Sequence, residues 1–167
     1  EASQDSAKDY VSLGLSAFSF WKETRLDERA EYLDKISTLY EENIGELLSI
    51  LSREAGKNLV DGVSEIREAV DFLRYYSSQA KKLDADRQPL GVVLCISPWN
   101  FPLAIFTGQI AAALVTGNTV IAKPAEQTPL IASFAIRLFR EAGLPDDVVQ
   151  LALGHGSTIG AELVADN

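Results

Sequence analysis

Two short segments contain the residues whose types and spacing could do chemistry. Residues 96–102 read Ile-Ser-Pro-Trp-Asn-Phe-Pro, and residues 123–129 read Lys-Pro-Ala-Glu-Gln-Thr-Pro. Each segment follows a short apolar run rich in β-branched residues, as expected after a buried strand. If the two runs are parallel strands, both segments lie at the carboxyl edge of one sheet. Open α/β proteins bind their ligands at this edge.

Asn100 is the residue of the first segment best suited to catalysis. Its side-chain amide can donate a hydrogen bond to an oxygen on which negative charge develops. Pro98 and Pro102 push the preceding residues towards extended backbone, which makes the turn stiff. A second interpretation stays open, in which Asn100 only caps the helix that begins nearby.

Lys123 and Glu126 of the second segment are candidates to bind a nucleotide sugar. A carboxylate at the carboxyl end of a strand accepts hydrogen bonds from ribose hydroxyls in dinucleotide-binding folds. An exposed ion pair of little energetic value is the alternative. The pattern Gly154-x-Gly156-x-x-x-Gly160 follows a third apolar run. It fits either a cofactor-binding turn or a merely tight strand-to-helix turn.

The single cysteine and the single histidine do not indicate a catalytic or metal site. Cys95 lies inside the apolar run 92–96 with no neighbouring cation, so we expect a buried, inert thiol. For His155, a solvated loop position and a position at a cofactor edge are both open. One cysteine and one histidine cannot assemble a zinc site, and we expect no metal.

Composition excludes several classes of function. The 167 residues are 47% hydrophobic and 23% charged, an ordinary globular balance. A net charge of −9 argues against nucleic-acid binding, and no apolar run is long enough to span a membrane. One cysteine and a polar N-terminus indicate a cytoplasmic protein. Because the chain begins at Glu1 and stops at Asn167 without a terminating motif, we expect a piece of a longer protein.

Periodicity predicts two regions and an α/β fold. Residues 1–83 are expected to be helical, because apolar residues recur every three or four positions. Residues 84–167 alternate strand and helix, which predicts the first βαβαβα part of a parallel sheet. The predicted helices are Ser6–Trp21, one from an N-cap at Asp27 to Gly56, one across Val60–Tyr76, Leu103–Thr116, Pro129–Ala142 with Thr128 as N-cap, and Ser157–Ala165. The predicted strands are Gly91–Ile96, Thr119–Lys123 and Val148–Leu153.

The two segments and the glycine pattern, in this order and spacing, resemble the aldehyde dehydrogenase superfamily. Residues 101–114, Phe-Pro-Leu-Ala-Ile-Phe-Thr-Gly-Gln-Ile-Ala-Ala-Ala-Leu, are most similar to the 1-pyrroline-5-carboxylate dehydrogenase module of bifunctional bacterial proline-utilization proteins. The resemblance is close over residues 91–160 and weaker before them. It implies N-terminal helices followed by half of a Rossmann-like NAD-binding domain, without the catalytic domain.

The resemblance also implies a role for each candidate residue. Asn100 would stabilise the oxyanion that forms when a cysteine attacks an aldehyde, with NAD as cofactor. That cysteine and a general-base glutamate are expected beyond residue 167, so this chain alone should be inactive. Lys123 and Glu126 would bind the adenosine ribose, and Gly156 and Gly160 would lie near the adenine end. The full set of expected cofactor contacts is Ile96, Ser97, Pro98, Trp99, Lys123, Ala125, Glu126, Gly156 and Gly160.

By the same resemblance, the intact protein oxidises L-glutamate γ-semialdehyde to glutamate in proline catabolism and forms a homo-oligomer. Whether a proline dehydrogenase domain is fused to it stays open. So does the aldehyde, because the residues that bind its tail are mostly absent from this segment. The alternatives are another aldehyde dehydrogenase and a non-catalytic module that retains the fold.

Overall fold

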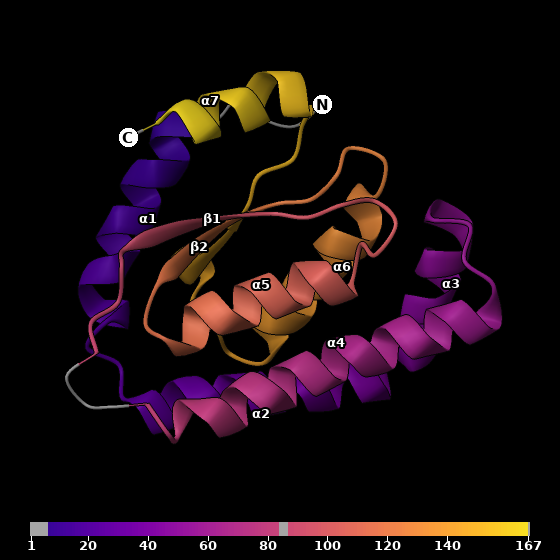
Figure 1. The fold of residues 1–167 in the computed structure, drawn as a ribbon, viewed down its shortest axis with the longest axis horizontal. Helices are drawn as coiled ribbons and strands as arrows, with labels where there is room; N and C mark the ends of the chain where they lie inside the picture. The colour runs from indigo at the N-terminus through magenta and orange to yellow at the C-terminus, as the bar shows by residue number, and fades with distance from the viewer. Residues whose placement is uncertain (1–6, 84–86, 167) are drawn as a thin grey trace.

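The computed structural model describes residues 7–83 and 87–166, and it has the expected α/β fold (Figure 1). Helices come first along the chain, and strands then alternate with helices. The helices are α1 (Ala7–Trp21), α2 (Leu26–Glu42), α3 (Ile44–Glu54), α4 (Leu59–Ala80), α5 (Ala104–Val115), α6 (Pro129–Glu141) and α7 (Ala161–Ala165), with a 3₁₀ turn at Asp146–Val148 and a π-helical turn at Gly156–Gly160. The strands are β1 (Val92–Ile96), β2 (Thr119–Lys123) and β3 (Val149–Leu151).

The three strands form one parallel sheet in the order β1-β2-β3. Alternate residues of β2 enter different cores, as strand geometry requires. Val120 and Ala122 pack on the side of α5 and α6, whereas Ile121 packs towards α1 and α7. The sheet is therefore covered on both faces, which is the usual condition of a parallel sheet.

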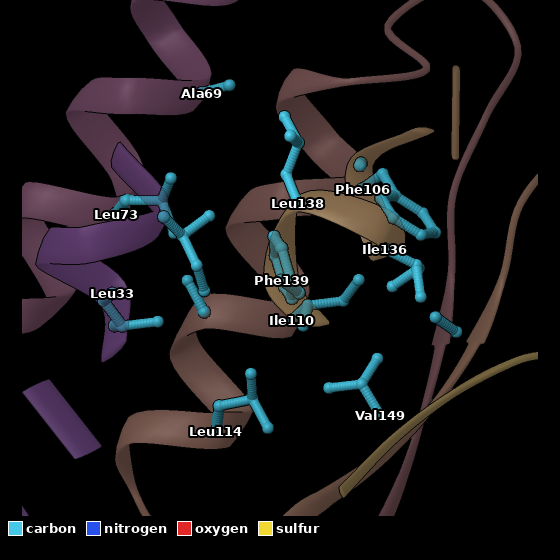
Figure 2. Close-up of a cluster of buried hydrophobic side chains, with 14 of the residues drawn as sticks. Leu33, Ala69, Leu73, Phe106, Ile110, Leu114, Ile136, Leu138, Phe139 and Val149 are labelled. Atoms are coloured by element: carbon cyan, nitrogen blue, oxygen red, sulfur yellow. The ribbon is translucent and has the colours of Figure 1, made fainter. Parts of the chain in front are cut away.

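The main core lies between the sheet and the helices α2, α4, α5 and α6. Figure 2 shows Leu33, Leu73, Ile110 and Phe139 converging there from these four helices. Helix α5 is apolar on almost every side, because it lies between the sheet and the outer pair α2 and α4 (Figure 1). This sandwich fixes the position of α5, which follows the Asn100 turn directly.

One predicted helix is two helices in the structure. The helix expected from Asp27 to Gly56 breaks at Asn43, between α2 and α3. The Asn43 side chain donates to Leu39 O at 2.9 Å, and such a local bond competes with continuation of the helix. The expected N-cap was also wrong: Arg25 occupies that position, and Asp27 pairs with it from the first turn.

The predicted elements after β2 also differ in detail. Strand β3 is shorter than the expected Val148–Leu153 at both ends: a 3₁₀ turn that follows Pro145 takes up Val148, and the strand ends at Leu151. The expected helix Ser157–Ala165 begins as a π-helical turn and becomes α-helical only at Ala161. The expected boundary between the two regions, at residue 84, lies outside the described residues. The division into 1–83 and 84–167 remains a prediction.

Thr128 precedes α6 as predicted, with Pro129 at the first helical position, but it does not cap the helix. Its hydroxyl is buried without a hydrogen-bond partner among the described residues. Glu54 of α3 accepts the hydrogen bonds from Leu130 N at 2.7 Å and Ile131 N at 2.9 Å instead. A distant carboxylate thus replaces the local cap.

Candidate functional site

The two segments meet at the carboxyl edge of the sheet, as expected. Ile96 is the register partner of Lys123, and the Ser97 N–H donates to the Lys123 carbonyl at 3.2 Å. A groove of about 570 Å³ opens beside this edge, and we call it the edge groove. Its lining residues are Ile96, Ser97, Lys123, Ala125, Glu126, Gly156, Gly160, Ala161, Val164 and Ala165.

Seven of the nine residues expected to contact a cofactor line the edge groove; Pro98 and Trp99 do not. Three residues that were not predicted as cofactor contacts also line the edge groove, Ala161, Val164 and Ala165. They share one face of α7, because positions three and four residues apart lie together on a helix. This spacing, directly after the glycine pattern, was the signal that could have identified them.

Lys123 is buried at the end of β2, with only 3% of its surface exposed. Its Nζ donates to the Pro124 carbonyl at 2.9 Å and lies 3.8 Å from Glu126 Oε2. A Cβ added at Gly160 would lie 3.1 Å from Lys123 Cε, so a glycine lets the lysine stem lie against the π-helical turn. The ammonium group is thereby held at the wall of the groove.

Glu126 links the end of β2 to the glycine turn. Its Oε2 accepts a hydrogen bond from Gly156 N at 3.3 Å, and His155 Nδ1 lies 3.9 Å from its Oε1. The pKa of Glu126 is lowered, chiefly by a hydrogen bond from its own backbone N–H and with help from the Gly156 N–H. Glu126 is therefore an ionised acceptor at neutral pH. His155 is an exposed loop residue beside it.

Ser97 adds a polar atom that the protein itself does not use. Its Oγ is buried and has no hydrogen-bond partner within the described part of the chain. Buried polar atoms are normally paired, so an orphan on the wall of a groove fits a site that a ligand completes. Together with Lys123 and Glu126, it offers hydroxyl, ammonium and carboxylate groups. Such a set suits a ligand rich in hydroxyls, as the ribose of NAD is.

Asn100 lies on the turn between β1 and α5, next to the exposed Trp99. The alternative that Asn100 caps α5 is wrong, because α5 begins at Ala104 and receives its cap from another element. Glu65 Oε1 accepts from Leu103 N at 2.8 Å and Ala104 N at 3.3 Å. The Asn100 amide is exposed at the same sheet edge as the groove.

Cys95 is buried inside β1, as expected. Burial raises the pKa of the Cys95 thiol to about 11, because a thiolate is poorly solvated there. The reactive thiolate is therefore scarce at neutral pH. Among residues 7–83 and 87–166, no group of three His, Cys, Asp or Glu side chains could hold a metal ion. None of the described helices is long and apolar enough to cross a bilayer.

Comparison with known proteins identifies the family. The model of the aldehyde dehydrogenase family matches residues 1–167. The chain belongs to the aldehyde dehydrogenase family. This confirms the resemblance that the two segments and the glycine pattern suggested.

Three relatives illustrate the similarity. The chain is 50% identical over 169 residues to bifunctional protein PutA of Escherichia coli. This match covers 100% of the chain and 13% of that protein. It is 37% identical over 178 residues to 1-pyrroline-5-carboxylate dehydrogenase of Anoxybacillus flavithermus, covering 98% of the chain and 35% of that protein. It is 34% identical to 2,5-dioxopentanoate dehydrogenase of Saccharolobus solfataricus, again over 98% of the chain and 37% of that protein.

Solved structures agree with the sequence comparison. A crystal structure of bifunctional proline utilization A matches with a TM-score of 0.90 at 44% identity, over 96% of this chain and 18% of that one. The 1-pyrroline-5-carboxylate dehydrogenase from Thermus with bound NAD matches with a TM-score of 0.90 at 36% identity, over 95% of this chain and 34% of that one. The chain thus spans about an eighth of the bifunctional relatives and about a third of the shorter ones.

Cys95 should resist alkylation in the folded protein. A pKa of about 11 leaves only about one thiolate in 10³ molecules at pH 8. Iodoacetamide labelling of the peptide that contains Cys95, followed by mass spectrometry, should be slow in buffer and fast in denaturing urea. Equally fast labelling under both conditions would show that the thiol is accessible and ionised.

Proposed function

We propose that the full-length protein containing this chain is an NAD-dependent aldehyde dehydrogenase that oxidises L-glutamate γ-semialdehyde to glutamate in proline catabolism. The observation that carries the proposal is the meeting of the edge groove and the Asn100 turn at one sheet edge, in a member of this family. The substrate follows from identities of 37–50% to 1-pyrroline-5-carboxylate dehydrogenase and PutA proteins. Because those relatives of 50% identity are bifunctional, we also propose a fused proline dehydrogenase domain. A homo-oligomeric enzyme is proposed on the family resemblance alone.

The edge groove is proposed to bind the adenosine half of NAD. Glu126 accepts hydrogen bonds from the ribose hydroxyls, and Lys123 and Ser97 donate to the same sugar. Because Gly156 and Gly160 have no side chains, the π-helical turn leaves space for the adenine against α7. We propose that residues 84–167 form this part of the NAD-binding domain and that residues 1–83 form a helical region that packs against it.

Asn100 is proposed to act on the aldehyde. A cysteine from the rest of the full-length protein adds to the carbonyl carbon, and the Asn100 amide donates to the oxygen that becomes negatively charged. NAD would supply the hydride acceptor for the thiohemiacetal carbon, whose oxidation leaves a thioester on the cysteine. A glutamate from the rest of the protein then activates the water that releases the acid. Asn100 needs no proton transfer and no change of charge in this cycle.

A second candidate is a related aldehyde that also carries a carboxylate. The similarity to 2,5-dioxopentanoate dehydrogenase supports it, although the identity is lower. Kinetics of the full-length enzyme with L-glutamate γ-semialdehyde, 2,5-dioxopentanoate and an uncharged aliphatic aldehyde distinguish the candidates. The highest kcat/KM identifies the substrate.

Asn100→Ala in the full-length enzyme should lower kcat by roughly 10²–10³, the usual effect of losing one oxyanion donor. The dissociation constant of NAD should stay unchanged, because Asn100 does not line the groove. Gln109→Ala, which removes an exposed amide from α5, is the matched control and should behave as the wild type. A near-normal kcat for Asn100→Ala would refute the proposed role.

Glu126→Gln should weaken the discrimination between NAD and NADP. The ionised carboxylate repels a 2′-phosphate, so its neutral isostere should narrow the preference for NAD by about tenfold, or ~1.4 kcal/mol. Dissociation constants of both cofactors are to be measured for the full-length enzyme, with the exposed Glu141→Gln as control. Unchanged discrimination would show that Glu126 does not face the ribose.

The 167-residue chain alone should form no NADH from aldehydes. Its only thiol lies in the interior of β1, and we expect the nucleophile and the general base elsewhere in the full-length protein. Absorbance at the NADH wavelength, with L-glutamate γ-semialdehyde as substrate, measures this directly. Turnover that disappears in Cys95→Ala would overturn our interpretation of this cysteine.

A further inference from the structure

Glu65 of α4 is a buried carboxylate whose two oxygens have different partners. Only 1% of its side chain is exposed. Oε1 accepts the two backbone hydrogen bonds at the start of α5, from Leu103 and Ala104. Oε2 lies 2.6 Å from Lys57 Nζ. Because burial of an unpaired carboxylate is very costly, the two backbone hydrogen bonds and the ion pair hold Glu65 in a defined orientation.

Lys57 connects this carboxylate to the ring that follows Asn100. Its side chain is 13% exposed, and Nζ lies 4.4 Å from the centroid of the Phe101 ring, within cation–π distance. Gly56 precedes it with φ of 67°, a conformation that a glycine adopts without strain. The Lys57 N–H then donates to Leu51 O at 3.3 Å, so the loop between α3 and α4 is itself held in place.

The contacts of Glu65 and Lys57 fall on the residues immediately after Asn100. Lys57 holds the ring of Phe101, and Glu65 holds the N–H of Leu103. Pro102 between them is buried and has a fixed φ. Helix α4, which carries Glu65, packs along α5 (Figure 1). Glu65 therefore belongs to the packed core and not to a loop.

We propose that Glu65 and Lys57 are positioning residues for the oxyanion donor Asn100. This inference rests on the proposed function, because it needs Asn100 to act on the aldehyde oxygen. Glu65 fixes the start of α5, and Lys57 fixes the ring of Phe101. The Asn100 amide lies between β1 and these two fixed points, so it is held in one orientation. A preorganised donor of this kind stabilises the transition state without reorganisation.

The charges of the pair agree with this role. The N-terminus of a helix is partly positive and would itself attract an oxyanion. Glu65 already accepts the hydrogen bonds from Leu103 and Ala104, so a nearby oxyanion depends on the Asn100 amide. A lone Glu65 would also repel the oxyanion, but Lys57 neutralises it at 2.6 Å. The pair thus removes a competing donor without leaving a net charge beside the reaction.

A purely structural role for Glu65 is the competing explanation, and the chain contains a control for it. Glu54 caps α6 through Leu130 and Ile131 much as Glu65 caps α5. The residues before α6 include no proposed oxyanion donor. A variant at Glu54 therefore disturbs a helix cap by the same chemistry, at a distance from Asn100.

The test uses the full-length enzyme with Glu65→Gln, Lys57→Gln, Lys57→Arg and the control Glu54→Gln. We expect kcat to fall roughly tenfold or more for the first two, because small displacements of a catalytic group are costly. KM for NAD should stay within about twofold of the wild-type value. Lys57→Arg should retain kcat, since a guanidinium preserves the charge and stacks on the ring. Glu54→Gln should retain kcat even if it lowers the melting temperature.

Coupling to Asn100 decides between positioning and simple destabilisation. If Glu65 acts through Asn100, Glu65→Gln should change kcat less than twofold in the Asn100→Ala background. If Glu65→Gln lowers kcat by the same factor in the Asn100→Ala background as in the wild type, the inference is overturned and the role of Asn100 stays intact. Normal kcat in both Glu65→Gln and Lys57→Gln has the same consequence. A normal kcat for Asn100→Ala overturns the proposed role of Asn100 together with this inference. If Glu65→Gln does not fold, Phe101→Leu, which removes only the ring contact, replaces it in the same cycle.

Discussion

The parallel pairing of β1 with β2 is the constraint on which the rest of the site depends. The register places Ile96 opposite Lys123, so the two segments leave the sheet side by side. A slip by one residue would turn every side chain of β1 to the other face. Cys95 would then leave the main core, and Ser97 would lose its bond to the Lys123 carbonyl. The apolar faces of the strands therefore fix the polar geometry at their ends.

Carboxylates from the helical region control how the chain leaves each strand. Glu65 accepts a hydrogen bond from the backbone N–H at the start of α5, which follows β1. Glu54 does the same at the start of α6, which follows β2. Both lie in the first helices of the chain and reach helices that follow the strands. The N-terminal region thus contributes to the edge of the sheet through hydrogen bonds as well as through packing.

The sequence predicted those features that depend on local patterns. Strand β2 and the burial of Cys95 follow from short β-branched apolar runs, and Pro129 marked the start of α6. The replacement of a local helix cap by a side chain from a distant helix could not be predicted. Glu54 lies 76 residues from Leu130, and nothing near Thr128 shows that a distant carboxylate takes over its capping role. The break at Asn43 was missed because the apolar stripe continues across it, and periodicity does not register one competing side-chain bond.

The arrangement of the turn also explains why β1, which leads to the proposed oxyanion donor Asn100, cannot supply the nucleophile. β1 and α5, which flank the Asn100 turn, both pack into the main core, and burial in this core raises the pKa of the Cys95 thiol to about 11. A group that must ionise and attack needs an electropositive, accessible position. Rigidity and reactivity therefore cannot share this strand. In the proposed mechanism the thiolate comes from another element, which approaches the Asn100 amide from its exposed side. There the side chain can meet substrate without disturbing the core that holds it.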